Sequence, residues 1–270
     1  AVFLLKDKDN KTTVQAELNK RFKTKKEASD FLSKCISAEF TIESVEKKPA
    51  KKSPAPPFTT STLQQEASRK LGYSVAKTMM VAQQLYESGN IPYMRTDSVN
   101  LSNLAIGMAK KVIGTNYGEN YIKTRKYTTK TKSAQEAHEA IRPTYIDKLT
   151  IKGDQSQQKL YELIWKRTVA SQMADAQLEK TTISIGISTS SEKFVARGEV
   201  IKFDGFLKVY LESTDDEETE TKSGMLPPLR EGDKLTRLEI AATERFTQAP
   251  PRYTEASLVK KLEDLGIGRP

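Results

Sequence analysis

The sequence predicts an α+β fold in which a helical domain is inserted into a β-rich domain. Short runs of alternating apolar and polar residues occur near the N-terminus and again between residues 181 and 241, as in half-buried strands. Between these runs, from about residue 54 to 176, apolar residues recur at helical spacing. The predicted domains are residues 1–53, the first part of the β-rich domain; 54–178, the helical domain; 179–245, the second part of the β-rich domain; and 246–270, the start of a further helical domain.

The composition favours an acidic partner. The chain has 270 residues, a length that leaves room for two domains with a substantial core, and its formal net charge is +9. A basic balance suits nucleic acid, although excess lysine also simply aids solubility. The single cysteine, Cys35, excludes an internal disulfide and a cysteine-based zinc site, and it suits a reducing compartment. The sequence contains no membrane-length apolar run and no recognisable signal peptide, so we expect no membrane partner.

The first fifty residues mix strand and helix signals. We expect strands at 2–5, 12–18 and 39–46 and a helix at 25–35. Asp7 and Asp9 could suggest a metal site, but a calcium loop would need glycine and glutamate where the chain has Thr12 and Leu18. A charged hairpin turn is therefore the prediction. The lysine-, proline- and serine-rich residues 47–57 predict a solvated linker, with a basic arm on a phosphate backbone as the alternative.

Helix-capping residues divide the helical block. A helix is expected to begin near residues 59–62, with a capping box from Ser61 and Gln64 or from Thr62 and Gln65, and to run to Gly72. The other predicted helices are 74–88 capped by Ser74, one from Ser102 to Gly114, a long one after Asp154, and one after Thr254 that ends before Gly266.

The rest of the chain is predicted to return to strands. Alternation indicates strands at 181–188, 193–201, 206–211 and 234–241. Residues 212–220 are rich in acids that repel one another, which predicts a solvated loop.

Two polar surfaces of the helical block are candidates for binding nucleic acid. Residues 116–133 interleave lysines and arginines with tyrosines, which suits single-stranded nucleic acid because charges follow the backbone while rings stack on bases. A flexible surface loop explains the same residues equally well. The outer face of the helix that ends at Gly72 carries Gln64, which is either solvated or able to grip phosphate oxygens.

Residues 89–102 form a polar connector between two predicted helices. Tyr93, Arg95 and Asp97 are spaced i, i+2, i+4, which places them on one side of an extended segment. A loop tyrosine is ordinarily a half-buried packing residue. A phenol can act as a nucleophile only with a proton acceptor and a nearby cation, and Asp97 and Arg95 could supply these.

Four stretches of the chain resemble one protein family. Residues 92–102, Pro-Tyr-Met-Arg-Thr-Asp-Ser-Val-Asn-Leu-Ser, are similar to the active-site segment of bacterial type IA DNA topoisomerases. Residues 53–72, 134–144 and 246–270 agree with further segments of that family in the same order. The resemblance implies an arched β-rich domain that carries an inserted helical domain with the catalytic tyrosine.

The resemblance also implies a reaction and its site. Tyr93 would attack a backbone phosphorus of single-stranded DNA, Arg95 and His138 would contact the phosphate, and Asp97 would orient neighbouring groups. The residues expected to bind DNA are Gln64, Arg142, Arg252 and Arg269. From the residues alone, His138 would be structural, as lone histidines usually are. If the local helix persisted, His138 and Arg142 would share one of its faces.

The family pattern predicts parts that the chain does not contain. The chain starts without methionine and stops inside the last motif, so we expect a central fragment without the N-terminal TOPRIM domain and the C-terminal zinc-ribbon region. The family's Mg²⁺ ligands lie in that N-terminal domain, and we expect none here. The fragment alone is therefore expected to be inactive.

The whole protein is expected to be a cytoplasmic, nucleoid-associated monomer acting on single-stranded and negatively supercoiled DNA without ATP. A non-catalytic clamp or adaptor for single-stranded nucleic acid is the alternative. A tyrosine-recombinase-like enzyme is a weaker rival, because it would want two arginines and a histidine around a tyrosine near the chain's end.

Overall fold

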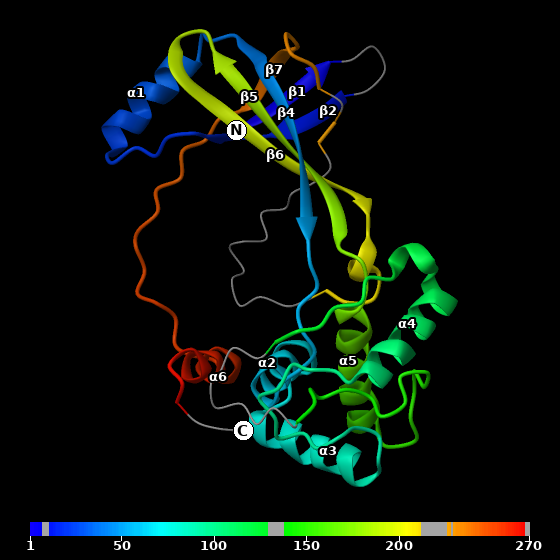
Figure 1. Ribbon diagram of the computed structural model, residues 1–270. Helices are drawn as coiled ribbons and strands as arrows, with labels where there is room; N and C mark the ends of the chain where they lie inside the picture. Colours follow the sequence, from blue (N-terminus) through cyan, green and yellow to red (C-terminus); the bar gives the residue numbers. More distant parts are fainter. Residues whose placement is uncertain (7–10, 129–137, 212–225, 228, 268–270) are drawn as a thin grey trace. The chain divides into compact units, whose positions relative to one another are not determined.

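The protein is described by a computed structural model covering residues 1–6, 11–128, 138–211, 226–227 and 229–267. The chain divides into two compact units (Figure 1). We call residues 1–50, 177–202 and 218–250 the β unit, and residues 51–176, 203–217 and 251–270 the helical unit. The mixed α/β fold class predicted from the sequence is confirmed. Residues 251–270 group with the helical unit, whereas the sequence suggested that they start another domain.

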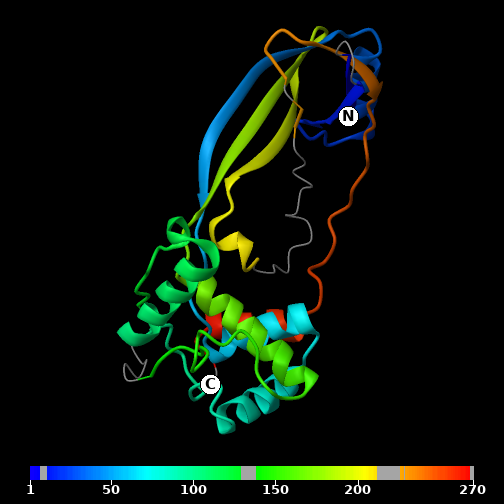
Figure 2. The same cartoon turned by 90° about the vertical axis from the view of Figure 1, so that its right-hand side faces the viewer.

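The described strands form one sheet (Figure 2). In the described part of the chain it has seven strands in the order β2-β1-β7-β4-β5-β6-β3. Their bounds are β1 Val2–Lys6, β2 Lys11–Gln15, β3 Glu17–Leu18, β4 Phe40–Lys52, β5 Ala176–Ile187, β6 Ser190–Phe203 and β7 Lys234–Glu239. β1 pairs antiparallel with both β2 and β7, and Phe3 lies opposite Val14 in the first pair.

The core of the β unit is built around phenylalanines. Phe3, Phe40 and Phe194 are almost fully buried, and the Phe3 ring lies 5.0 Å from Phe40 and 5.4 Å from Phe194 between ring centroids. Helix α1 (Lys25–Cys35) adds Phe31 and Cys35 to this core and is capped by Thr24. These large rings supply the apolar contact that holds the sheet and α1 together.

Two strand predictions are wrong. β4 continues to Lys52, so the first part of the predicted linker is strand, because ladder hydrogen bonds use the backbone and leave lysine side chains exposed. Residues predicted as the strand 206–211 instead begin with a 3-10 helix, η2 (Gly205–Lys208). Gly205 has φ +51°, and a Cβ there would lie 2.5 Å from the Ala174 carbonyl oxygen, so the chain turns tightly where only glycine fits.

The helical unit follows the predicted order of helices. Its bounds are α2 Thr60–Leu71, α3 Val75–Glu87, α4 Asn103–Tyr117, η1 Glu119–Tyr121, α5 Gln155–Ser171 and α6 Glu255–Asp264. Ser74, Ser102, Asp154 and Thr254 are N-caps, as expected. The helix predicted from near residues 59–62 to Gly72 is confirmed as α2, but its predicted capping box is wrong: Thr59 is the N-cap and forms the box with Thr62.

The predicted end of the helix after Ser102 is also wrong. α4 passes through Gly114 and ends at Gly118, which has φ +105°. Gly114 lies inside α4, where a Cβ would meet the ends of the Glu119 and Ile122 side chains, so this glycine does not end the helix.

α5 is the centre of the helical unit's core. Leu160, Ile164 and Val169 are fully buried. The indole N–H of Trp165 donates to the Ile146 carbonyl at 2.7 Å, and the Tyr161 hydroxyl donates to the Lys148 carbonyl at 2.8 Å. Within the described residues, no helix is both long and apolar enough to cross a membrane. The predicted turn at Asp7 and Asp9 and the acidic run 212–220 lie outside the described residues.

Candidate active site

The tyrosine segment is extended and alternates in exposure. Met94, Thr96 and Ser98 are buried, at 1%, 4% and 1% exposure. Tyr93 is 43% exposed, Arg95 is exposed and Asp97 is half-buried. The i, i+2, i+4 spacing therefore places the phenol and the guanidinium on the accessible side of a segment whose other side is fixed in the core.

The reactive atoms of this segment are accessible. The Tyr93 ring makes an edge contact with Tyr86 of α3 at 5.5 Å between centroids, so the ring packs on a helix while the residue stays 43% exposed. Among the described residues, the structure shows no hydrogen bond or ion pair to the Tyr93 hydroxyl or the Arg95 guanidinium. An accessible phenol two residues from a cation that has no partner among the described residues is a pairing suited to an anionic substrate.

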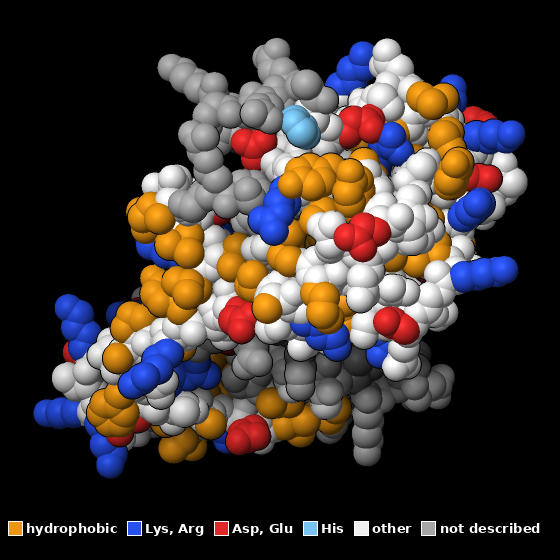
Figure 3. Space-filling model, turned by 90° about the horizontal axis from the view of Figure 1, so that it is seen from below, with side chains coloured by type: hydrophobic (Ala, Val, Ile, Leu, Met, Phe, Trp, Pro, Cys, Tyr) orange, Lys and Arg blue, Asp and Glu red, His pale blue; other side chains and the backbone are white. Residues whose placement is uncertain are grey.

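The histidine segment runs beside the tyrosine segment. Ala140 N–H donates to the Asn100 carbonyl at 2.8 Å, and Thr144 N–H donates to the Asn90 carbonyl at 2.9 Å. Asn90 and Asn100 flank Tyr93, so these two bonds hold the histidine segment across the tyrosine segment. His138, two residues from Ala140, is half-buried, and Figure 3 shows it at the surface among charged and apolar side chains.

The condition under which His138 and Arg142 would share a helix face is not met in the structure. The described residues of this second segment are not helical, and Ile141 forms an isolated antiparallel bridge with Phe58. His138 and Arg142 therefore do not share a helix face. Pro143 disfavours helix at the preceding residue, and the backbone groups pair with the neighbouring segments instead.

Arg142 is held by an ion pair. Its Nε donates to Glu139 Oε2 at 2.9 Å, and its Nη1 donates to the Pro143 carbonyl, also at 2.9 Å. The other Glu139 oxygen accepts from the Ser102 N–H at 2.6 Å, at the start of α4. Burial alone raises the pKa of the Glu139 carboxyl, but the hydrogen bonds from Ser102 and Arg142 outweigh it and lower the pKa. The carboxylate therefore stays charged and orients Arg142.

The other residues expected to bind DNA are spread over the helical unit. Gln64 is half-buried on α2, and Arg252 is exposed just before α6. Arg269 lies outside the described residues. α6 packs on the start of α2, where Glu263 Oε2 accepts from Ser61 Oγ at 2.8 Å and from Gln65 Nε2 at 3.0 Å. Glu255 Oε2 accepts from the Val75 N–H at 2.7 Å, at the start of α3.

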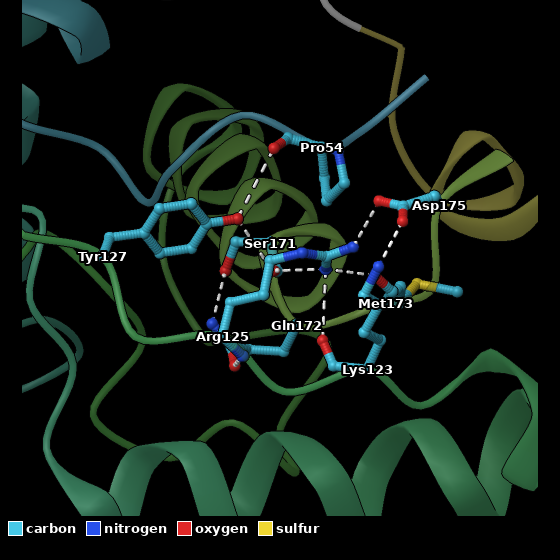
Figure 4. Close-up of polar contacts among 8 residues, drawn as sticks. All are labelled: Pro54, Lys123, Arg125, Tyr127, Ser171, Gln172, Met173 and Asp175. Carbon is cyan, nitrogen blue, oxygen red and sulfur yellow. Dashed lines mark hydrogen bonds and ion pairs between the residues drawn. The ribbon is translucent and has the colours of Figure 1, made fainter. Parts of the chain in front are cut away.

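The basic connector is anchored in its described part, 116–128. Figure 4 shows Arg125 donating to the carbonyls of Lys123, Ser171 and Met173 and to Asp175 Oδ1, the last at 2.6 Å. Tyr127 donates its hydroxyl to the Ser171 carbonyl at 3.0 Å, and Lys123 pairs with Asp175. Arg125 and Tyr127 thus donate hydrogen bonds to backbone carbonyls at the C-terminal end of α5, which lack helical partners.

This anchoring changes the two interpretations of the connector. Neither a flexible loop nor a free basic strip describes Arg125 and Tyr127, because their polar atoms are already bound within the protein. Lys126 remains exposed. Lys130 and Lys132 lie outside the described residues. The sequence alone could not reveal these bonds, because α5 ends more than forty residues later in the chain.

The described residues contain no group of three or more His, Cys, Asp or Glu side chains placed to hold a metal ion. They therefore do not fit the magnesium site that the family resemblance implies for the whole protein, and no chemical step can be assigned to a metal held by these residues.

The helical unit thus presents an exposed tyrosine two residues from an exposed arginine. A family model described as DNA topoisomerase matches residues 2–270, and the chain belongs to that family. The resemblance found in the sequence to bacterial type IA topoisomerases is confirmed.

Curated relatives and a solved structure agree with this assignment. The chain is 51% identical over 259 residues to DNA topoisomerase 1 of Rickettsia felis, covering 91% of this chain and 33% of that protein. It is also 51% identical over 255 residues to DNA topoisomerase 1 of Zymomonas mobilis, covering 92% of this chain and 21% of the relative.

Full-length topoisomerase I from Thermotoga maritima superposes with a TM-score of 0.77 at 35% identity, covering 99% of this chain and 44% of that one. The chain thus spans about a third or less of the length of these curated relatives.

Proposed function

We propose that this chain is the tyrosine-bearing part of an ATP-independent type IA DNA topoisomerase, an isomerase that relaxes negatively supercoiled DNA by transient cleavage of one strand. The observation that supports this most directly is the exposed Tyr93 beside Arg95, on a segment whose alternate residues are buried. The proposed protein is a monomer in the cytoplasm, associated with the nucleoid.

The proposed reaction is a transesterification. The Tyr93 oxygen forms a bond to a backbone phosphorus as the bond to the 3′ oxygen breaks, giving a 5′-phosphotyrosyl link. One phosphoester bond replaces another, so their number is unchanged. The phenol loses its proton and the departing 3′ oxygen gains one. Another strand passes through the gap, and the 3′ hydroxyl then attacks the same phosphorus and releases the tyrosine. ATP is unnecessary because the covalent link conserves the phosphodiester.

Three further side chains have proposed roles at this phosphate. Arg95 stabilises the negative charge that develops on the phosphate oxygens, as a preorganised cation does. His138 contacts the same phosphate from the neighbouring segment. Asp97 orients groups around the tyrosine and can accept a proton.

The proposed DNA contacts lie on the same unit. Gln64, Arg142, Arg252 and Arg269 would contact single-stranded backbone, with side-chain amides and guanidiniums as donors to phosphate. Arg142 would do so by sharing its guanidinium between Glu139 and a phosphate oxygen, since its planar fork has five N–H donors. The Mg²⁺ proposed for the whole enzyme would be held by residues outside this chain.

The decisive experiment uses the full-length protein and a 3′-labelled oligonucleotide, because the 5′-phosphotyrosyl link retains the 3′ end of the cleaved strand on the protein. Denaturing the reaction should trap a DNA adduct on the wild-type protein and none on the Tyr93→Phe variant, which lacks the attacking oxygen. Tyr86→Phe is the matched control, because Tyr86 contacts the same ring and should still form the adduct. An adduct on the Tyr93→Phe variant would contradict the proposal, and DNA binding without any adduct on the wild-type protein would favour the clamp instead.

The 270-residue chain itself gives a second test. We expect it to fold and to bind single-stranded DNA weakly, but not to relax supercoiled plasmid, because it lacks the proposed metal site. Relaxation by the purified chain, abolished by Tyr93→Phe, would contradict this part of the proposal.

A further inference from the structure

We propose that residues 56–60 position the reactive segments against each other, and that Thr60 is the positioning residue for the attack by Tyr93. This inference rests on the proposed function. Three alternate residues of this short stretch, Pro56, Phe58 and Thr60, each hold a different part of the helical unit. None of the three touches the reacting atoms in the proposed mechanism.

Thr60 holds the tyrosine segment by its backbone and its hydroxyl. Its N–H donates to the Thr96 carbonyl at 2.9 Å, and its hydroxyl donates to the Met94 carbonyl at 2.7 Å. The same hydroxyl oxygen accepts from the Thr96 N–H at 2.8 Å. The Thr60 side chain therefore fixes the peptide groups on both sides of Arg95, which lies two residues after Tyr93.

Phe58 holds the histidine segment. Its carbonyl accepts from the Ile141 N–H at 2.8 Å, in the isolated bridge between these two residues. Phe58 is fully buried, so this bond is shielded from water. Since Phe58 and Thr60 are separated only by Thr59, the extended N-cap of α2, the separation of the two reactive segments is set by one short stretch of chain.

Pro56 and Phe58 are in turn fixed by a buried arginine of α5. Arg167 is 3% exposed, its Nε donates to the Pro56 carbonyl at 2.6 Å, and its guanidinium lies 4.9 Å from the Phe58 ring centroid. It also lies 5.5 Å from the Tyr210 ring, whose hydroxyl donates to Glu66 Oε2 at 2.5 Å. Residues 56–60 are thus tied to the helix at the centre of the unit's core.

The position of Thr60 makes it important for rate as well as for stability. In-line attack requires the phenolic oxygen to lie about 3–3.5 Å from phosphorus, and an error of about 1 Å can cost roughly 100-fold in rate. The Thr60 hydroxyl bonds to carbonyl and amide groups one and three residues after Tyr93. Its loss leaves those buried groups unpaired, so the segment must shift to satisfy them.

The test compares variants of the full-length protein in single-turnover cleavage of saturating single-stranded DNA. Thr60→Val keeps the side-chain shape and removes the hydroxyl, and we expect cleavage to slow about 10- to 100-fold with DNA affinity within about threefold. Thr60→Ser restores the hydroxyl and should recover most of the rate.

Thr78→Val is the matched control. Thr78 is fully buried in α3, and among the described residues its hydroxyl bonds only to the carbonyl of Ser74, the N-cap of that helix. It should lower the unfolding temperature to a similar degree while leaving the cleavage rate unchanged. Equal rates for the Thr60→Val and wild-type proteins, or equal losses for the two valine variants, would overturn the positioning role.

Two measurements keep the test informative. If Thr60→Val does not fold at the assay temperature, Thr60→Cys replaces it, because a thiol is a weaker donor of similar size. A wild-type cleavage rate for the Thr60→Cys variant would then overturn the inference. Tyr93→Phe is assayed alongside: an adduct on that variant refutes the proposed function, whereas its absence together with full activity of the Thr60 variants refutes only the positioning role.

Discussion

At the scale of single residues, exposure along the tyrosine segment separates support from chemistry. Met94 and Thr96 are buried and bonded, whereas Tyr93 and Arg95 face solvent. A buried side chain on every second residue holds the backbone, and the exposed ones remain available for a substrate. In the neighbouring segment, Glu139 is committed to Arg142 and Ser102 by hydrogen bonds.

Removing the exposed cation should reduce cleavage without abolishing it. In the full-length protein, Arg95→Ala should lower the amount of adduct formed per minute by about 100-fold, the usual effect of deleting one preorganised donor to a developing charge. Quenched-flow cleavage of labelled single-stranded DNA measures this rate. Arg21→Ala, at an exposed arginine in the β unit, should leave it unchanged. A cleavage rate for Arg95→Ala close to that of the wild-type protein would exclude Arg95 from the reaction.

Asp175 should make the helical unit sensitive to acid. Burial raises the pKa of its carboxyl, but hydrogen bonds from Lys123 and Ser53 and the Arg125 guanidinium outweigh burial and lower the pKa from 3.8 to about 2. A lowered carboxyl pKa stabilises the fold fully above pH 3.8, and this stabilisation is lost as the pH falls toward about 2.

The fluorescence of Trp165, the only tryptophan, can follow this loss. Between about pH 4 and pH 2 the unfolding temperature of Asp175→Asn should fall less than that of the wild-type chain, because the variant has no such carboxyl to protonate. Asp147→Asn, at an exposed site in the same unit, should behave like wild type. Parallel pH profiles for wild type and Asp175→Asn would contradict the stabilising role of this ion-pair cluster.

At the scale of elements, α6 is held to the helical unit mainly by polar contacts at helix starts. Glu263 bonds to Ser61 and Gln65 of α2, and Glu255 bonds to the first N–H of α3. Carboxylates are favourable near helix N-termini because the backbone N–H groups there lack helical partners. Only Ala256 of α6 is buried, so little apolar area supports these contacts.

Loss of the Glu263 contacts should loosen α6. Glu263→Ala removes two hydrogen bonds to a charged acceptor, worth roughly 1 kcal/mol at an exposed site, so amide exchange in α6 should speed up about fivefold. Hydrogen–deuterium exchange of the 270-residue chain measures this directly. Asp264→Ala removes the same charge from the next residue of α6 and should change exchange much less. Equal exchange in the two variants would show that Glu263 does not hold the helix.

At the scale of the whole molecule, two separate cores stabilise the chain. The phenylalanine core belongs to the β unit, and the core around α5 belongs to the helical unit. Each unit is assembled from segments far apart in the sequence, so neither can be cut out as one continuous piece. The single tryptophan lies in the helical core and therefore reports on that unit alone.

A cavity in the β unit should leave the helical unit largely intact. Phe194→Ala removes a ring that contacts Phe3, Phe31 and Phe40, and should lower the free energy of unfolding of the β unit by about 3–5 kcal/mol. Thermal scans should then show an early transition by far-ultraviolet circular dichroism, with the Trp165 fluorescence transition little changed. A single shared transition, shifted equally in both signals, would show instead that the two cores unfold together.

The sequence by itself determined the features that depend on neighbouring residues. Helix starts at Ser74, Ser102, Asp154 and Thr254 were predictable because a cap and its partner lie within three residues. The side of the chain on which Tyr93 and Arg95 lie followed from the period of an extended segment. The family followed from four motifs in order, which are also local.

Only the tertiary structure decided features whose partners lie far along the chain. Thr60 bonds to residues 34 and 36 positions away, and Arg125 bonds to groups near the end of α5. The turn at Gly205 forms because its backbone closely approaches Ala174 and Asp175. The sequence left open whether the helix around His138 persists to Arg142; in the structure this segment pairs with Phe58 and Asn100 instead. Buried backbone groups must be paired, and which partner they find is settled by packing rather than by local preference.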